Sequence, residues 1–387
     1  MEHLPSSRLR LCVVGSGTRF LSGISYYTIR LANVLAESNS VSVILMRQLL
    51  PTRFYPGQNR VGASLSSQKF VPQVKVYDGI DWYWFPSILR AISFLVRERP
   101  EVIIFQWWSG TVLHSYLLLA WIGRLLRSRI VVEFHEVLDT AEASRPLVRA
   151  YVRWLMPWLI RAAAGFVIHS EFDREALNKQ YLLRDRPVEI IPHGPYDHYN
   201  YSNAQPPYRD APRDCCNLLY FGVIRPFKGV EDLITAFNTI SPNEIDQYWL
   251  TIVGETWEDW TLPAELISHS SYRKRITFVN RYVSDAEAAA LFAGADAVVL
   301  PYHRSSSSGP LHIAMSQGLP VIITRVGGIP ESVEDYEGAV LIPPQDPEAL
   351  RKEIIRVRDL HGKRFNNPRS WKLTSRLYSN LFDSICP

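Results

Sequence analysis

Residues 300–324 read Leu-Pro-Tyr-His-Arg-Ser-Ser-Ser-Ser-Gly-Pro-Leu-His-Ile-Ala-Met-Ser-Gln-Gly-Leu-Pro-Val-Ile-Ile-Thr, and this stretch decides the fold class. An apolar strand ends at Leu300, a loop of small residues follows, and a helix begins with Pro310 near its first position. Backbone N–H groups at the start of a helix attract anions, so the pattern predicts contacts to a diphosphate. The alternative interpretation is a helix cap without a ligand, because Ser and Gly are favoured there in any case. The candidate residues are Ser305, Ser306, Ser307, Ser308, Gly309, Pro310, Leu311 and His312.

On both sides of this stretch, short apolar runs alternate with segments of helical periodicity. Continuous Val and Ile runs, as in 102–106 and 297–300, are typical of strands buried on both faces of a parallel sheet. We therefore predict an α/β protein with two Rossmann-like, doubly wound domains. The expected strands are 9–14, 41–46, 102–106, 130–134, 165–169 and 188–191, then 218–223, 250–253, 276–279, 297–300, 320–324 and 339–342.

The chain length of 387 residues suits two domains. Residues 199–217 are rich in Asn, Pro, Asp and Arg and predict a linker between a domain over 1–198 and a domain over 218–369. A final helix over about 370–385 is expected to pack back onto the first domain. Ligands of such proteins usually bind in a cleft between the domains, so we expect the site there.

The composition gives no reason to expect a membrane-spanning, disulfide-rich, metal-binding or nucleic-acid-binding protein. Apolar residues make up 47% and charged residues 21%, which is ordinary for a globular protein, and no apolar run is long enough to span a membrane. The four cysteines show neither metal-ligand spacing nor a disulfide framework, which favours a cytoplasmic protein. There is no His-x-x-x-His pair, so no metal and no cofactor is predicted. A net charge of +4 gives no reason to expect nucleic acid.

A second cluster, residues 220–229, reads Tyr-Phe-Gly-Val-Ile-Arg-Pro-Phe-Lys-Gly. A buried strand ends at Gly222, and the following turn presents Arg225 and Lys228 before the next helix. Cations at the carboxyl end of such a strand suit a pair of phosphates, with Arg as a fork and Lys as a point charge. The alternative is two solvated loop cations.

The first strand of the chain ends in a glycine-containing loop with Gly15, Gly17 and Gly23. A dinucleotide fingerprint would need a third glycine at position 20, which is Phe, so we interpret these glycines as a loop that approaches a ligand closely. His135 follows the strand 130–134 and is flanked by Glu133 and Glu136. It is either a polar site residue or a structural histidine.

Segment 146–164 carries Arg149, Arg153 and Arg161 at multiples of four, with tyrosine, tryptophan and leucine between them. A basic and aromatic helix face of this kind is typical of peripheral contact with an anionic membrane. The other interpretation is a packed helix with a solvated stripe, kinked at Pro157.

Together these stretches resemble the retaining glycosyltransferases of family 4 (glycosyl transferases group 1). The motifs that carry the resemblance are Ile191-Pro-His-Gly194, Phe221-Gly222, Lys228-Gly229, Ile252-Val-Gly254, Ala295-Asp296, Ala314-Met315, Gly318-Leu-Pro-Val-Ile322 and Val326-Gly-Gly-Ile-Pro-Glu331. The resemblance implies a GT-B fold and metal-independent transfer, with retained configuration, from a nucleotide-sugar donor to a carbohydrate or lipid-linked acceptor in polysaccharide or glycoconjugate synthesis. The diphosphate would lie against Lys228 and the serine-rich loop, His135 near the sugar, and the base against Arg281, Tyr282 and Val283.

Three departures from the family pattern stand out. Ser305 and Ile313 occupy positions where the family commonly has two glutamates that hold the donor sugar and the ribose. Val223 replaces the arginine that usually follows Gly222, with Arg225 as the stand-in, and the second glycine that usually follows Gly254 is missing. These departures keep two alternatives open, namely a non-catalytic relative and a GT-B enzyme of the sugar-nucleotide epimerase type.

Overall fold

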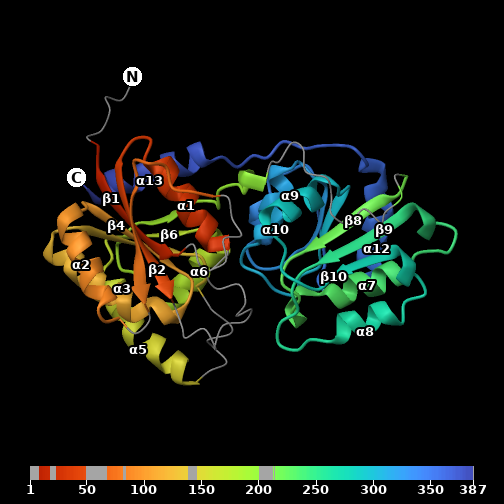
Figure 1. Cartoon of the computed structure of the whole chain (residues 1–387), viewed down its shortest axis with the longest axis horizontal. Helices are drawn as coiled ribbons and strands as arrows, with labels where there is room; N and C mark the ends of the chain where they lie inside the picture. The colour runs from red at the N-terminus through yellow and green to blue at the C-terminus, as the bar shows by residue number, and fades with distance from the viewer. Residues whose placement is uncertain are drawn as a thin grey trace. The chain divides into compact units, whose positions relative to one another are not determined.

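A computed structural model describes residues 8–17, 23–48, 68–81, 84–137, 146–199, 212 and 214–386. The chain forms two compact units, one of residues 1–194 with 370–387 and one of residues 195–369 (Figure 1). Each unit holds a parallel sheet with the strand order of a doubly wound fold. The prediction of two Rossmann-like α/β domains is therefore confirmed.

In the first unit the described strands form a seven-stranded sheet of order β3-β2-β1-β4-β5-β6-β7. The strands are β1 (Arg10–Ser16), β2 (Ser40–Gln48), β3 (Lys75–Asp81), β4 (Val102–Trp107), β5 (Arg129–Phe134), β6 (Gly165–Ile168) and β7 (Val188–Ile190). The helices are α1 (Gly23–Leu35), α2 (Ser87–Glu98), α3 (Leu113–Leu125), α5 (Pro146–Ala162), α6 (Glu171–Gln180) and α13 (Trp371–Ile385).

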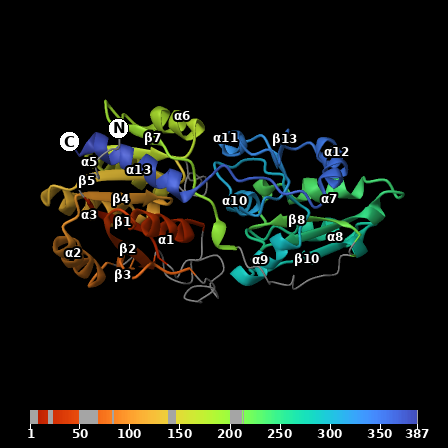
Figure 2. The ribbon, with the colours of Figure 1, turned by 90° about the horizontal axis from the view of Figure 1, so that it is seen from above.

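Both faces of this sheet are covered by helices because its strands are apolar on both sides. Cys12 and Val14 of β1 pack into a core with α2, α3 and α5, whereas Leu11 and Val13 pack into a second core with α1 and α13. Figure 2 shows α13, in blue, among the elements of the first unit. The last helix of the chain thus completes the fold of its first part.

In the second unit the described strands form a six-stranded sheet of order β10-β9-β8-β11-β12-β13. The strands are β8 (Cys216–Phe221), β9 (Tyr248–Val253), β10 (Ile276–Val279), β11 (Ala297–Leu300), β12 (Val321–Thr324) and β13 (Ala339–Ile342). The helices are α7 (Val230–Asn238), α8 (Leu262–Ser268), α9 (Asp285–Ala293), α10 (Gly309–Ser316), α11 (Ile329–Val333) and α12 (Pro347–Val357). Short 3-10 turns include η4 (Asp197–Tyr199) and η5 (Pro226–Lys228).

The strand β3 was not among the expected strands. Its sequence, Lys-Val-Tyr-Asp-Gly-Ile-Asp, mixes charged and apolar residues because it is an edge strand with an exposed first half. An edge strand needs no continuous apolar run, so the pattern that found the inner strands does not detect it.

The boundary between the two parts also differs from the predicted one. Residues 195–199 belong to the second unit, where Tyr196 stacks on His312 and Gln317 donates a hydrogen bond to the backbone of Tyr199. Strand β8 already begins at Cys216, inside the range expected as linker. Most of that range, residues 200–211 and 213, lies outside the described residues.

Candidate active site

Parallel strands bring their carboxyl ends to one edge of a sheet, and ligands of open α/β sheets bind where the strand order reverses. In the second unit this reversal lies between β8 and β11, whose following loops hold Arg225 and Lys228 on one side and the serine-rich segment on the other. The tertiary structure therefore brings the two sequence clusters to the same point of one unit.

The two loops are joined directly. The backbone N–H of His303 donates to the carbonyl of Phe227 at 2.9 Å, and the His303 Nε2 lies 2.7 Å from the Asp232 carboxylate. Lys228 places its Nζ 4.0 Å from the centroid of the Tyr302 ring, a cation–π contact. These contacts hold Lys228 beside the loop that leads into α10.

Three cations gather around one aromatic ring. The guanidinium carbons of Arg304 and Arg225 lie 4.5 Å and 4.7 Å from the centroid of Phe227, and the Lys228 Nζ lies 5.5 Å from it. Arg225 also forms an ion pair with Glu258. Guanidinium and ammonium groups are common protein ligands of phosphate, so this cluster at the ends of β8 and β11 suits a phosphate group. Sequence reasoning missed Arg304, although its place after a strand end was visible.

One serine of the serine-rich loop caps a helix, and the three before it do not. Ser308 is the N-cap of α10, because its Oγ accepts from the N–H of Leu311 at 3.2 Å, and it also bonds the Tyr302 hydroxyl at 2.9 Å. The capping interpretation therefore holds for Ser308. Ser305 donates to the carbonyl of Ser307, and all three of Ser305, Ser306 and Ser307 are partly exposed. Pro310 stands in the first turn of α10, as predicted.

His312 and Leu311 are buried in α10, and the His312 ring stacks on Tyr196. Gly222 directly follows β8 and has a positive φ of 136°. Gly309 opens α10.

The loop after β10 is shaped by a charge pair. Arg281 bonds the Glu287 carboxylate at 2.6 Å, and this hydrogen bond, aided by the capping contacts of Ser284, lowers the pKa of Glu287 to about 2. Arg281 also donates to the carbonyl of Tyr282, and Val283 is buried. The loop thus lies at the same edge of the sheet as the cation cluster, and its contacts to a base stay a prediction.

In the first unit, the glycines of the first loop serve internal packing. A side chain at Gly15 would meet the Gln106 Oε1 at 2.3 Å, and one at Gly17 would meet the carbonyl of Met46 at 2.4 Å. Gly23 is the first residue of α1. The small residues at the end of β1 are therefore explained by close packing, with or without a ligand.

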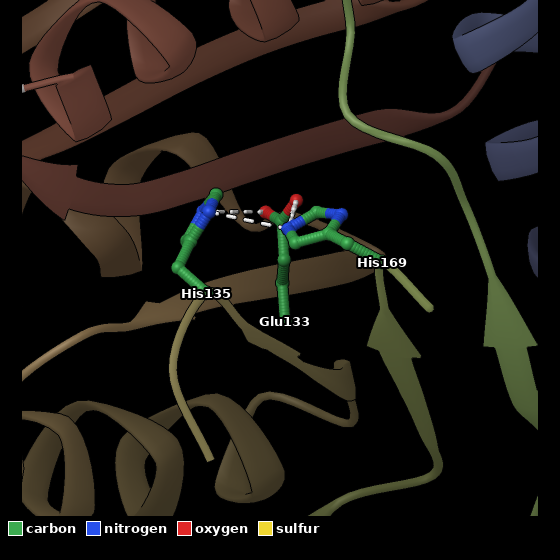
Figure 3. A group of neighbouring side chains, drawn as sticks. All are labelled: Glu133, His135 and His169. Carbon is green, nitrogen blue, oxygen red and sulfur yellow. Dashed lines mark hydrogen bonds and ion pairs between the residues drawn. The ribbon is translucent and has the colours of Figure 1, made fainter. Parts of the chain in front are cut away.

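His135 follows β5 and lies inside the first unit. Its side chain is 5% exposed, and its Nδ1 is 3.2 Å from the Nε2 of His169, which follows β6 (Figure 3). Burial, with His169 beside it, lowers the pKa of His135 well below its usual range, so the ring is neutral at pH 7. Both ring nitrogens face protein side chains, and a contact to a donor sugar stays a prediction.

Glu133, His135 and His169 converge closely enough for their nitrogen and oxygen atoms to reach one metal ion. Spacing in the sequence did not indicate this group, because 34 residues separate the two histidines. The available signal was that each histidine directly follows an apolar strand.

Comparison with known proteins identifies the class. Residues 21–195 match the model described as glycosyltransferase family 4, and residues 215–359 match the one described as glycosyl transferases group 1. The fold is that of GT-B glycosyltransferases: a glycosyltransferase from Rickettsia africae superposes with a TM-score of 0.67 at 14% identity, covering 98% of this chain and 99% of the other. Anabaena HepE in complex with UDP gives 0.63 at 16% identity, covering 97% and 95%. The chain belongs to family 4 of the GT-B glycosyltransferases.

Two curated relatives extend the comparison. A D-inositol 3-phosphate glycosyltransferase of Segniliparus rotundus is 24% identical over 87% of this chain and 77% of its own length. A glycogen synthase of Mycobacterium tuberculosis is 26% identical over 73% of this chain and 62% of its own length.

Proposed function

We propose that this protein is a retaining glycosyltransferase that moves a sugar from a nucleotide-diphosphate sugar to a glycan or lipid-linked acceptor, in polysaccharide or glycoconjugate synthesis. The observation that carries the proposal is the cluster of Arg225, Lys228 and Arg304 around Phe227, at the strand reversal of the second unit. Departure of the nucleoside diphosphate is the difficult step of such a transfer. Fixed cations stabilise the negative charge that develops on it, so no metal is needed at the diphosphate.

Among the nucleoside diphosphates, we propose UDP as the nucleotide that this protein binds. HepE, which shares the fold, has been solved with UDP and with UDP-glucose. The base would contact the loop after β10, where Arg281 is already held by Glu287. Ser305 and Ile313 stand in place of the two glutamates that commonly hold the donor sugar and the ribose. We therefore propose that the donor sugar differs from the donors common in the family.

The test is binding of UDP, GDP, ADP and TDP, measured by calorimetry and thermal shift with and without magnesium or manganese. We expect one nucleotide to bind without metal, and a hundredfold excess over its Kd stabilises the protein by about 2.7 kcal/mol. Lys228→Ala should weaken the binding of that nucleotide at least tenfold, about 1.4 kcal/mol, and lower turnover by a similar factor.

The matched control is Lys352→Ala, which removes an exposed lysine of α12 that pairs with Glu348. It should leave affinity and turnover unchanged. Absence of nucleotide binding at millimolar concentration would overturn the proposal and favour a non-catalytic relative. Equal nucleotide affinity in Lys228→Ala and the wild type would show that Lys228 does not contact the nucleotide.

We further propose that the protein acts at the cytoplasmic face of a membrane through α5. Leu147 and Trp154 of this helix are 87% and 81% exposed, and Trp158 is also exposed beside Arg161. Arg149, Arg153 and Arg161 are exposed on the same helix. Within the described residues, no helix combines the length and apolar composition needed to cross a bilayer. Adsorption through a basic, aromatic face is the mode that this helix supports.

A further inference from the structure

The loop between β9 and α8, residues 254–261, lies beside the loop that carries Arg225. Strands β8 and β9 are parallel neighbours, so the loops that follow them leave the sheet at the same edge (Figure 1). The Ile224 N–H donates to the carbonyl of Glu255, and the Trp257 N–H donates to the carbonyl of Ile224, both at 3.0 Å. This is the loop in which the second glycine of the family pattern is missing. The residues that stand there instead join the loop after β9 to the loop after β8.

The guanidinium of Arg225 is contacted by side chains of both loops. Its central carbon lies 4.7 Å from the centroid of the Phe227 ring and 5.7 Å from that of Trp257. Its Nη2 also forms an ion pair with the Glu258 carboxylate. The two rings orient the guanidinium by themselves, because a planar cation stacks on aromatic faces. The carboxylate is therefore not needed for orientation, and it occupies a donor group that a phosphate oxygen could otherwise bind.

Glu258 is held in a backbone conformation that disfavours its residue type. Glu258 and Asp259 have φ values of 62° and 50°, in the left-handed region, which costs free energy in residues with a side chain. Such conformations persist where surrounding contacts impose them, and they are frequent in segments that respond to a ligand. One such contact is nearby, since the N–H and the hydroxyl of Thr256 both reach Asn280 Oδ1 at 2.9 Å. The anchored loop thus presents the Glu258 carboxylate to Arg225.

We propose that Glu258 competes with the diphosphate for Arg225 and thereby sets the affinity of the donor site for its nucleotide. This inference rests on the proposed transfer from a nucleotide-diphosphate sugar. In the empty site the arginine is paired with the carboxylate, and when a nucleoside diphosphate binds, the arginine exchanges the carboxylate for a phosphate. When the nucleotide leaves, the carboxylate takes the arginine back. Glu258 is thus a positioning residue that limits how tightly the released nucleotide is held.

The two partners of Arg225 differ moderately in strength, as a reversible exchange requires. The ion pair joins one nitrogen to one oxygen, whereas two phosphate oxygens can take both sides of the guanidinium fork. The Glu258 side chain is 50% exposed, so its carboxylate regains water readily once it is displaced. Exposed ion pairs of this kind are weak, and giving one up changes a coupled affinity by up to about fivefold.

The test compares two neighbouring carboxylates of the same loop. Glu258→Gln removes the competitor. Asp259→Asn is the matched control, because Asp259 is exposed, also has a left-handed backbone and has no ion pair within the described part of the chain. Calorimetry at constant salt should show UDP binding about fivefold tighter to Glu258→Gln and less than twofold tighter to Asp259→Asn. Stopped-flow tryptophan fluorescence should show UDP leaving Glu258→Gln more slowly by a similar factor. A gain in affinity of this kind cannot come from a damaged fold.

The variant Arg225→Gln shows whether the effect acts through the arginine. In this background, Glu258→Gln should change the affinity for UDP no more than Asp259→Asn does. A gain that persists without Arg225 would overturn the proposal. Equal or weaker binding of UDP by Glu258→Gln, compared with the wild type, would also overturn it and leave the proposed function intact, since UDP still binds. If neither the wild type nor Glu258→Gln binds UDP, GDP, ADP or TDP at millimolar concentration, the proposed function fails and the competition fails with it.

Discussion

At the scale of single residues, Gly229 shows how the cation cluster is held. This glycine follows Lys228 in the left-handed region, with a φ of 64°. A Cβ atom there would lie 2.0 Å from the carbonyl oxygen of Pro301, the residue that directly follows β11. The glycine thus lets the loop after β8 touch the loop after β11, and Lys228 reaches the Tyr302 ring as a result.

We expect Gly229→Ala to destabilise the protein by about 2–5 kcal/mol, from the left-handed backbone and from the collision with Pro301. The measurement is the free energy of unfolding by denaturant titration. Gly362→Ala is the matched control: its φ is 75°, but nothing lies within 4 Å of the added atom. It should cost only about 1–2 kcal/mol. Equal losses in the two variants would show that the contact with Pro301 does not constrain the loop.

At the scale of elements, α3 and α5 pack against each other and expose large apolar residues beside cations. Met156, Leu159 and Ile160 of α5 are buried in the core, which agrees with a packed helix. Trp154 and Trp158 are nevertheless exposed, and α3 adds exposed Trp121 and Leu125. The packed-helix interpretation therefore describes the buried side of α5. The membrane-contact interpretation describes its exposed side.

Replacing Arg149, Arg153 and Arg161 with Gln should weaken binding to vesicles of anionic lipid by about 3 kcal/mol, on the order of a hundredfold, since each cation near such a surface contributes about 1 kcal/mol. Vesicle sedimentation at constant salt measures this affinity for the vesicles. The control replaces Arg351, Lys352 and Arg356 of α12 with Gln, an equal change of charge in the second unit. Similar losses in both triple variants would indicate an effect of net charge rather than of α5.

At the scale of the whole molecule, the chain returns to its first unit after completing the second. Tyr378, Leu381 and Phe382 of α13 are buried against the sheet of the first unit, and Leu381 lies against Gly165 at the start of β6. The stability of the first unit therefore depends on residues that follow the second unit in the sequence.

Leu381→Ala should destabilise the first unit by about 2–5 kcal/mol through the cavity that it leaves. Native-state hydrogen exchange measures this strand by strand. Protection should fall in β1, β4 and β6 and stay unchanged in β8–β13. Lys372→Ala, at an exposed position of the same helix, should change neither set. An equal loss of protection in both units would contradict the division at residues 194 and 369.

Prediction from the sequence succeeded for the inner strands, such as 102–106 and 297–300, because a strand buried on both faces leaves a continuous apolar run. It located the turn with Arg225 and Lys228 for a similar reason, since a strand end followed by glycine and cations is a local pattern. It did not find β3, whose edge position allows charged residues, nor Arg304, whose place beside Phe227 depends on two loops that are distant in the chain.

The sequence by itself determined the two α/β domains, the family resemblance and a helix that begins near Pro310, because these follow from the period and order of neighbouring residues. Only the tertiary structure decided that Arg225, Lys228 and Arg304 share one aromatic ring and that Glu133, His135 and His169 meet inside the first unit. The physical reason is strand order. Parallel pairing of β5 with β6 and of β8 with β11 brings together side chains that are far apart in sequence, and no local pattern contains that pairing.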